Sequence, residues 1–282
     1  MRKRLKTVTV PLAVLLVLGA GNVALGDALL EYRWSPGSGV SRASFSFAPG
    51  RMRVDIEASG GSATILYDEG ARKMWIVDHT RRSYLEIGED LLRQIRQIRE
   101  QMEAQLSQLP PPVREQMERA MTPPGFTRLG ELPRDLCEGP RVVGTETVRK
   151  VPAKVVDGCK SLQGARWVTC RFWFGDGRAL GLNPEDFRVL SSFTEFSLEI
   201  LKTVGLPAAL GGGDLLIQPR AERYIDLGFA FPIVVKAAAI EEDRESGTMI
   251  LEKVSTQPLP GTAFALPQGY TRVEISVPRL RQ

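Results

Sequence analysis

The sequence predicts an α+β protein in which an antiparallel β-sheet is covered by about three helices. Apolar and polar residues alternate through most of residues 27–87 and again in the last third of the chain. Two stretches between them, at about 89–122 and 184–204, switch to the period of an α-helix. Strict alternation indicates strands with one buried and one solvated face, which is typical of antiparallel sheets, and the helices need the sheet to bury their apolar sides.

The first 26 residues have the three-part pattern of a secretory signal peptide. Basic residues at positions 2, 3, 4 and 6 precede an apolar stretch and then a tract of small residues. The apolar stretch is too short for a transmembrane helix, which needs roughly 20 apolar residues. We therefore expect cleavage near Ala24-Leu25-Gly26, with Asp27 as the first mature residue, and a periplasmic or secreted location. Retention by an uncleaved N-terminal anchor is the alternative.

Removal of the signal peptide would bring the formal net charge of the protein to zero. It takes away four basic residues and leaves 33 Lys and Arg against 33 Asp and Glu. The charge argument for a nucleic-acid partner therefore has no basis, although transient contact with a membrane stays open. With 43% hydrophobic residues, the chain is able to bury a sizeable core. We expect residues 27–282 to form a single domain and a monomer.

Residues 27–87 predict a meander of about six strands, because runs of alternating residues are separated by turn-forming Gly, Pro and Asp. One separator, Asp78-His79-Thr80 in MWIVDHTRRSYLEI, contains the only histidine of the chain. A general base needs a substrate within reach and an orienting group, and an Asp that directly precedes it in a hairpin points elsewhere. We therefore interpret His79 as a turn residue.

The sequence offers no other pattern for catalysis or metal binding. It has no GxSxG elbow, no CxxC spacing and no second histidine. We predict a protein that is not an enzyme and has no cofactor and no metal site. The three cysteines, Cys137, Cys159 and Cys170, fit an oxidising compartment in which one disulfide forms and one thiol is left over, and the sequence leaves the pairing open.

The region at about 89–122 predicts a helical hairpin inserted in the domain. Apolar residues at spacings of three and four form one stripe, while most charged residues lie outside it. The stripe consists of Leu91, Ile95, Ile98, Met102 and Leu106. Prolines at 110–112 end the first helix, and Val113, Met117 and Met121 define the second. Both helices should lay their apolar faces on the sheet.

A third helix is expected at about 184–204. Asn183 is a suitable N-cap, Pro184 suits the first helical position, and Leu182 can pack on Phe187. Gly205 and Pro207 provide the stop. The apolar residues cover more than one face of this helix, so we expect it to be well buried.

The order of these elements is similar to a known family. The motifs are the YDEG, MWIVD and RSYLEI hairpin, the helix pair with QMEAQLSQLPPPVREQMERAM, the strands with GTETV and PAKVVDG, then LGLNPEDF, FPIVVK and FALPQGY. Together they resemble an uncharacterised bacterial envelope family, a domain of unknown function that looks related in fold to the outer-membrane lipoprotein carrier and receptor proteins of the Lol system. The resemblance covers roughly residues 27–276 and implies a strongly curved antiparallel sheet, an incomplete barrel, whose hollow is covered by helices. It implies no catalytic residues. The family often has Cys where this chain has Ala153, so its cysteine pattern does not transfer.

Two hypotheses for function remain open. The first is that an apolar ligand, a lipid or an acylated polypeptide such as a lipoprotein, binds in the hollow beneath a helical lid. Methionine suits such a lining because its flexible side chain adapts to varied apolar shapes. The expected lining residues are Phe45, Phe47, Ile56, Trp75, Met102, Met117, Met121 and Trp173. The second hypothesis is a structural or interaction protein of the cell envelope in which the same residues fill an ordinary core. Each of these placements depends on the strand register, since a slip of one residue turns a side chain to the other face.

Overall fold

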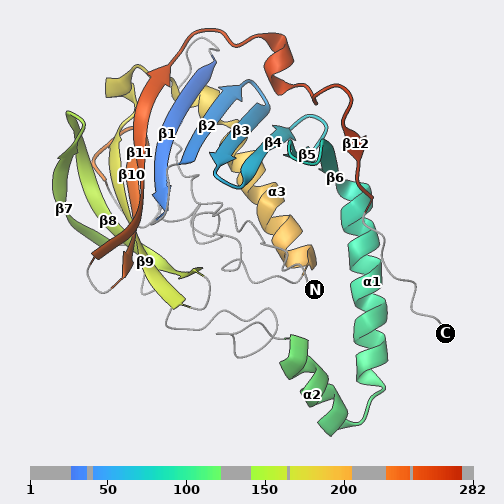
Figure 1. Ribbon diagram of the computed structural model, residues 1–282. Helices are drawn as coiled ribbons and strands as arrows, with labels where there is room; N and C mark the ends of the chain where they lie inside the picture. The colour runs from blue at the N-terminus through green and yellow to red at the C-terminus, as the bar shows by residue number, and fades with distance from the viewer. Residues whose placement is uncertain are drawn as a thin grey trace.

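The computed structural model describes residues 27–36, 41–121, 141–163, 166–204, 227–241 and 244–274. The predicted signal peptide and Cys137 lie outside these ranges. The described residues form one large sheet, with helices on one side of it (Figure 1).

Twelve strands of the described chain make up the sheet. In chain order they are β1 (Ala28–Pro36), β2 (Ser41–Ala48), β3 (Arg51–Ala58), β4 (Gly61–Asp68), β5 (Lys73–Asp78), β6 (Ser83–Ile87), β7 (Arg141–Val148), β8 (Val151–Gln163), β9 (Arg166–Asp176), β10 (Pro232–Glu241), β11 (Arg244–Ser255) and β12 (Thr271–Arg272). Their spatial order is β12-β6-β5-β4-β3-β2-β1-β11-β10-β9-β8-β7. All neighbours are antiparallel except β12, which pairs with β6 in parallel.

The sheet is open, because β12 and β7 are its two edges and do not pair with each other. It curves around the helices, most strongly through β7–β10 (Figure 1). The predicted incomplete barrel with about three helices is therefore confirmed. The helices are α1 (Glu89–Ser107), α2 (Pro111–Met121) and α3 (Val189–Val204), and the short 3-10 turns include η3 (Pro184–Phe187) and η5 (Gly261–Phe264).

The start of the third helix differs from the continuous helix expected at 184–204. The Asn183 side chain accepts a hydrogen bond from the backbone N–H of Glu185, as its capping role predicts. The next turn, however, has the three-residue spacing of a 3-10 helix, since the N–H of Asp186 bonds to the carbonyl of Asn183 and that of Arg188 to the carbonyl of Glu185. Regular α-helix begins at Val189.

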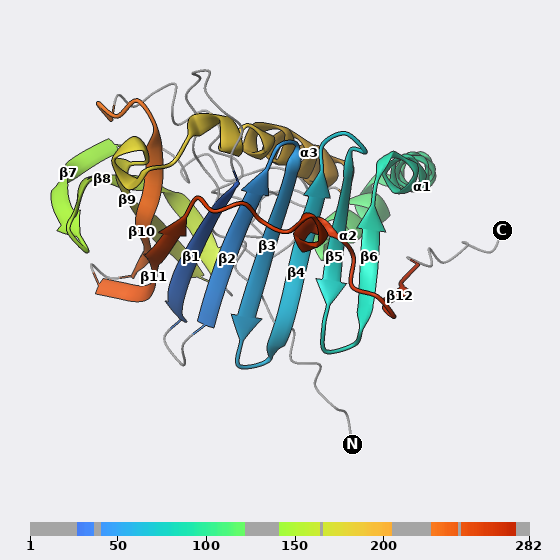
Figure 2. The same cartoon turned by 90° about the horizontal axis from the view of Figure 1, so that it is seen from above.

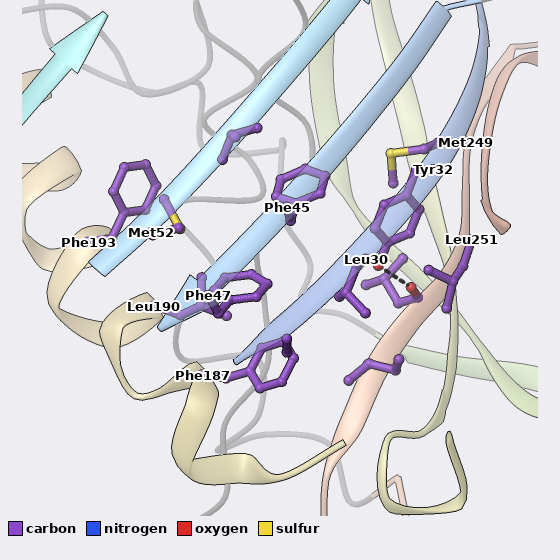
Figure 3. Close-up of a cluster of buried hydrophobic side chains, with 14 of the residues drawn as sticks. Leu30, Tyr32, Phe45, Phe47, Met52, Phe187, Leu190, Phe193, Met249 and Leu251 are labelled. Atoms are coloured by element: carbon purple, nitrogen blue, oxygen red, sulfur yellow. Dashed lines mark hydrogen bonds between the residues drawn. The ribbon is translucent and has the colours of Figure 1, made fainter. Parts of the chain in front are cut away.

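Helix α3 lies across the concave face of the sheet and packs on aromatic side chains (Figures 1 and 3). The rings of Phe47 and Phe187 are 4.5 Å apart between centroids, and those of Tyr67 and Phe193 are 5.5 Å apart in an edge-to-face arrangement. All four residues are buried. This packing accounts for the apolar character of α3 on more than one face.

The segment 256–274, which we call the C-terminal strap, crosses the opposite, outer face of β1–β6 (Figure 2). Arg53 on β3 donates a hydrogen bond of 2.7 Å to the carbonyl of Ala263, and the guanidinium of Arg51 lies over the ring of Phe264. On this face Leu66 and Val77 are 2% and 0% exposed. Both faces of the middle strands are therefore buried.

Within the described ranges, no helix is both long and apolar enough to cross a membrane.

Candidate functional site

Side chains on the concave face line up in rows across the strands, because antiparallel pairing places them directly opposite one another. The row nearest α3 consists of Ala28, Phe47, Met52, Tyr67, Met74 and Ile87. The next row, which we call the apolar row, consists of Leu30, Phe45, Val54, Ile65, Ile76 and Leu85. It is apolar over its full width from β1 to β6.

The apolar row is covered at one end and open at the other. Phe45, Val54 and Ile65 are buried, whereas Ile76 on β5 is 39% exposed and Leu85 on β6 is half-buried. The ring contacts of η3 and α3 go to Phe47 and Tyr67 of the neighbouring row. The concave face therefore offers an accessible apolar surface at its β5–β6 end.

Helices α1 and α2 lie on the same side of the sheet as α3 (Figure 1). The apolar stripe of α1 is incompletely buried, since Leu91, Ile95, Ile98 and Leu106 all keep intermediate exposure. Val113 on α2 is exposed. An amphipathic helix normally buries such a stripe, so these two helices retain apolar surface that a ligand is able to cover.

Four charged side chains, which we call the ion ring, tie the first half of α1 to the body of the domain, that is, to the sheet and α3. Arg72, in the turn between β4 and β5, contacts Glu199 of α3 at 2.6 Å and Glu89 of α1 at 3.0 Å. Arg96 of α1 contacts the same two carboxylates at 3.2 and 3.7 Å. The hydrogen bond from Arg72, followed by that from Arg96, lowers the pKa of Glu199 below its usual value. Each arginine thus bridges both glutamates.

The structure describes some of the expected lining residues and not others. Phe45, Phe47 and Ile56 are buried on the concave face, where the sequence predicted them. Met102, Met117 and Met121 lie on α1 and α2, but their side chains are outside the described part. Whether any of these residues contacts a ligand stays a prediction.

Trp75 requires a correction. It pairs with Leu66 on one side and Glu86 on the other, so its side chain lies on the outer face and not in the hollow. Its indole N–H donates a hydrogen bond of 3.1 Å to Glu86. The alternation in KMWIVD does not reveal this, because the C-terminal strap makes the outer face apolar as well.

Trp173 belongs to the same continuous core, but its polar edge is already occupied. Its indole N–H donates a 2.7 Å hydrogen bond to Glu146, and the Lys236 ammonium lies 4.0 Å from the ring centroid. These contacts favour a structural role for Trp173.

Ile76, which is exposed, and Leu85, which is half-buried, form the accessible end of the apolar row, and sequence reasoning missed both. They lie opposite each other on β5 and β6. The prediction pointed Trp75 of β5 into the hollow. It therefore placed its neighbour Ile76 on the outer face, because successive side chains of a strand point to opposite faces. The sequence does contain a pattern that gives the correct face. If MWIVD is paired with SYLEI about the turn, Met74 lies opposite Ile87, and Ile76 lies opposite Leu85 on the same face of the sheet.

His79 lies in the turn between β5 and β6, as predicted, and its side chain also fixes the C-terminal strap. The hydroxyl of Thr64 donates to Asp55, so it accepts from Nε2–H of His79 at 2.7 Å. Nδ1 then accepts from the hydroxyl of Tyr270 in the strap at 2.9 Å. The described contacts of His79 therefore join the sheet to the strap.

Cys170 lies on β9 with intermediate exposure, and Cys159 lies on β8 with its side chain outside the described part. The predicted disulfide is therefore still a prediction. Among the described residues, no group of three or more His, Cys, Asp and Glu is arranged to hold a metal ion.

No protein-family model matches the chain, and no curated protein matches it. It is similar to an uncharacterised conserved protein from Thermus thermophilus, with 7% identity, a TM-score of 0.42 and coverage of 88% of this chain and 90% of that one. It is also similar to the MucA/MucB complex structure from Pseudomonas aeruginosa, with 9% identity and a TM-score of 0.36, covering 89% of this chain but 59% of that chain. A LolA superfamily protein from Nitrosomonas europaea has 11% identity and a TM-score of 0.23, with coverage of 86% and 90%.

Replacement of His79 by alanine should loosen the strap near Tyr270. The change removes the donor to the buried Thr64 hydroxyl, which keeps its bond to Asp55, and the acceptor of the Tyr270 hydroxyl, and each lost hydrogen bond costs about 0.5–1.5 kcal/mol. The urea midpoint should fall, and the segment 256–274 should become more sensitive to limited proteolysis. Arg81→Ala, an exposed change in the same turn, should leave both unchanged. A His79→Ala protein of unaltered stability would contradict this role.

Stability should depend on pH through Glu86. A hydrogen bond from Lys73, then one from Trp75, and the charge of Arg272 in β12 hold the pKa of the Glu86 carboxyl below its usual value of 4.5. Because the folded-state pKa is depressed, this stabilisation is complete above about pH 4.5 and is lost as the pH falls through the folded-state pKa. The urea midpoint of the wild type should therefore fall more steeply from about pH 5 to 3 than that of Glu86→Gln. Equal slopes would refute the assignment, and Glu57→Gln, an exposed change on β3, is the matched control.

Proposed function

We propose that this is a non-catalytic periplasmic or exported protein that binds an apolar ligand, a lipid or an acylated polypeptide, between the concave face of its sheet and a lid made of α1 and α2. The observation that carries the proposal is the open end of the apolar row at Ile76 and Leu85. It lies in the same sheet from which α1 departs, directly after β6.

Binding would be driven by removal of apolar surface from water, at about 25 cal/mol per Å². The uncovered side chains of β5 and β6 offer one wall, and the partly exposed stripe of α1 offers another. An acyl chain has no polar groups to satisfy, so such walls need no hydrogen-bond donors. Movement of the lid would admit and release the ligand.

The close packing under α3 favours a second candidate, an interaction protein with a filled core. Phe187 of η3 and Phe193 of α3 pack on Phe47 and Tyr67 and leave no room for a ligand in that part of the concave face. On the first proposal the ligand site is therefore confined to the β5–β6 side. On the second, partners dock on the outside of the domain.

Purification from the native envelope without detergent, followed by mass spectrometry of organic extracts, distinguishes the two. The ligand-binding proposal expects a stoichiometric lipid or acyl species that a control periplasmic protein lacks. A ligand-free protein that also fails to bind a fluorescent fatty acid would support the interaction candidate instead.

The change Ile76→Lys should weaken binding of a fluorescent fatty acid about tenfold or more, because it replaces apolar contact surface with a charge. Val142→Lys is the matched control, since Val142 is 43% exposed on the distant edge strand β7. Fluorescence titration of both variants measures the effect. Equal affinities for the two variants would place the ligand elsewhere.

A further inference from the structure

We propose that the ion ring of Arg72, Glu89, Arg96 and Glu199 is a latch that holds α1 on the body, so that loosening these ion pairs sets how readily the lid moves. This inference rests on the proposed function for its biological meaning. The latch itself is a property of the free protein and is testable without a ligand.

A single residue connects α1, the first helix of the lid, to the strand that precedes it. β6 ends at Ile87 and α1 begins at Glu89, so Gly88 alone lies between them. Its backbone is extended, and no side chain caps the helix at this point. A connection of one small residue is suited to act as a hinge, since a hinge needs few positions to absorb a change in backbone angles.

The ring lies close to this hinge, at the first and second turns of α1. Glu89 and Arg96 face the body there, and Leu92 between them is fully buried. The helix continues for 19 residues in all, which is about 28 Å at the usual rise. A small rotation at Gly88 therefore moves the far end of α1 a long way, and the ring is placed to restrain that rotation.

Both anchoring points of the ring belong to other elements. Arg72 lies in the turn after β4. Its φ is +49°, a backbone conformation that residues other than glycine rarely adopt. Glu199 comes from α3, which is fixed by its aromatic packing. Because each arginine contacts both glutamates, α1 is tied to two elements that do not move with it.

The ion ring restrains α1 only weakly. A weak restraint is what a latch needs if it is to open. Its four side chains are 28–53% exposed, and exposed ion pairs contribute little and are screened by salt. Loss of Glu199 removes the contacts of both arginines with α3. We expect this change to increase local opening of α1 about three- to tenfold.

Hydrogen exchange of the α1 amides tests the latch. Glu199→Gln and Arg96→Gln should each raise the α1 exchange rate about three- to tenfold, while β3 amides keep the wild-type rate. The double variant should exchange no faster than the faster single variant, because each change already breaks the shared contact. Raising the salt from about 0.05 to 0.5 M should accelerate the wild type more than the double variant, which keeps only the Arg72–Glu89 pair.

Glu195→Gln is the matched control, an exposed change on α3 one turn before Glu199. It should leave the exchange of α1 unchanged. The latch is refuted if Glu199→Gln exchanges α1 at the wild-type rate, or if α1 and β3 accelerate equally, which would indicate general destabilisation.

Stopped-flow association of a fluorescent fatty acid separates the latch from the proposed function. Faster association in Glu199→Gln together with faster exchange supports both. Faster exchange with no fatty-acid binding by any form supports the latch and rejects ligand binding. Fatty-acid binding at an unchanged rate, together with unchanged exchange, rejects the latch and leaves ligand binding intact.

Discussion

The whole architecture depends on strand β1, which pairs with β2 on one side and β11 on the other. This strand joins the meander β12-β6-β5-β4-β3-β2 to the second half of the sheet, β11-β10-β9-β8-β7. Its side chain Tyr32 reinforces the junction, since its buried hydroxyl donates a 2.9 Å hydrogen bond to the carbonyl of Val234, 202 residues away in sequence. Burial also raises the pKa of Tyr32 well above its usual value, which keeps the hydroxyl protonated as a donor.

Alternation and turn residues were sufficient to predict the antiparallel sheet and the helices, because these depend on local periods of two and 3.6 residues. The face of each strand was harder to predict. In β3, charged residues alternate with Met52, Val54 and Ile56, and the inward side is clear. In β5 both sides are apolar, and the choice of Trp75 over Ile76 was wrong because the covering strap comes from nearly 200 residues further along the chain.

The described ion pairs around α1 and around Glu86 connect elements of the fold to one another. The ion ring joins α1, α3 and a turn, and Glu86 joins β5, β6 and β12. His79, the residue that first invites a catalytic interpretation, belongs to the same class, because its two ring nitrogens are used to fasten one segment to another. None of these contacts was readable from the sequence, since each joins residues that have no fixed spacing. Apolar surface is therefore the better guide to function in this chain.

The C-terminal strap also has a consequence for how the protein folds while it is being synthesised. The strands β3–β5 are synthesised early, but their outer face is covered by residues near Ala263 and Tyr270. Until those residues emerge, a meander with apolar side chains on both faces, and with the β11 side of β1 unpaired, is exposed to other chains. Long-range pairing of this kind is slow and prone to aggregation. Folding of the growing chain thus places a demand on holding chaperones that a chain with a self-contained meander would not make.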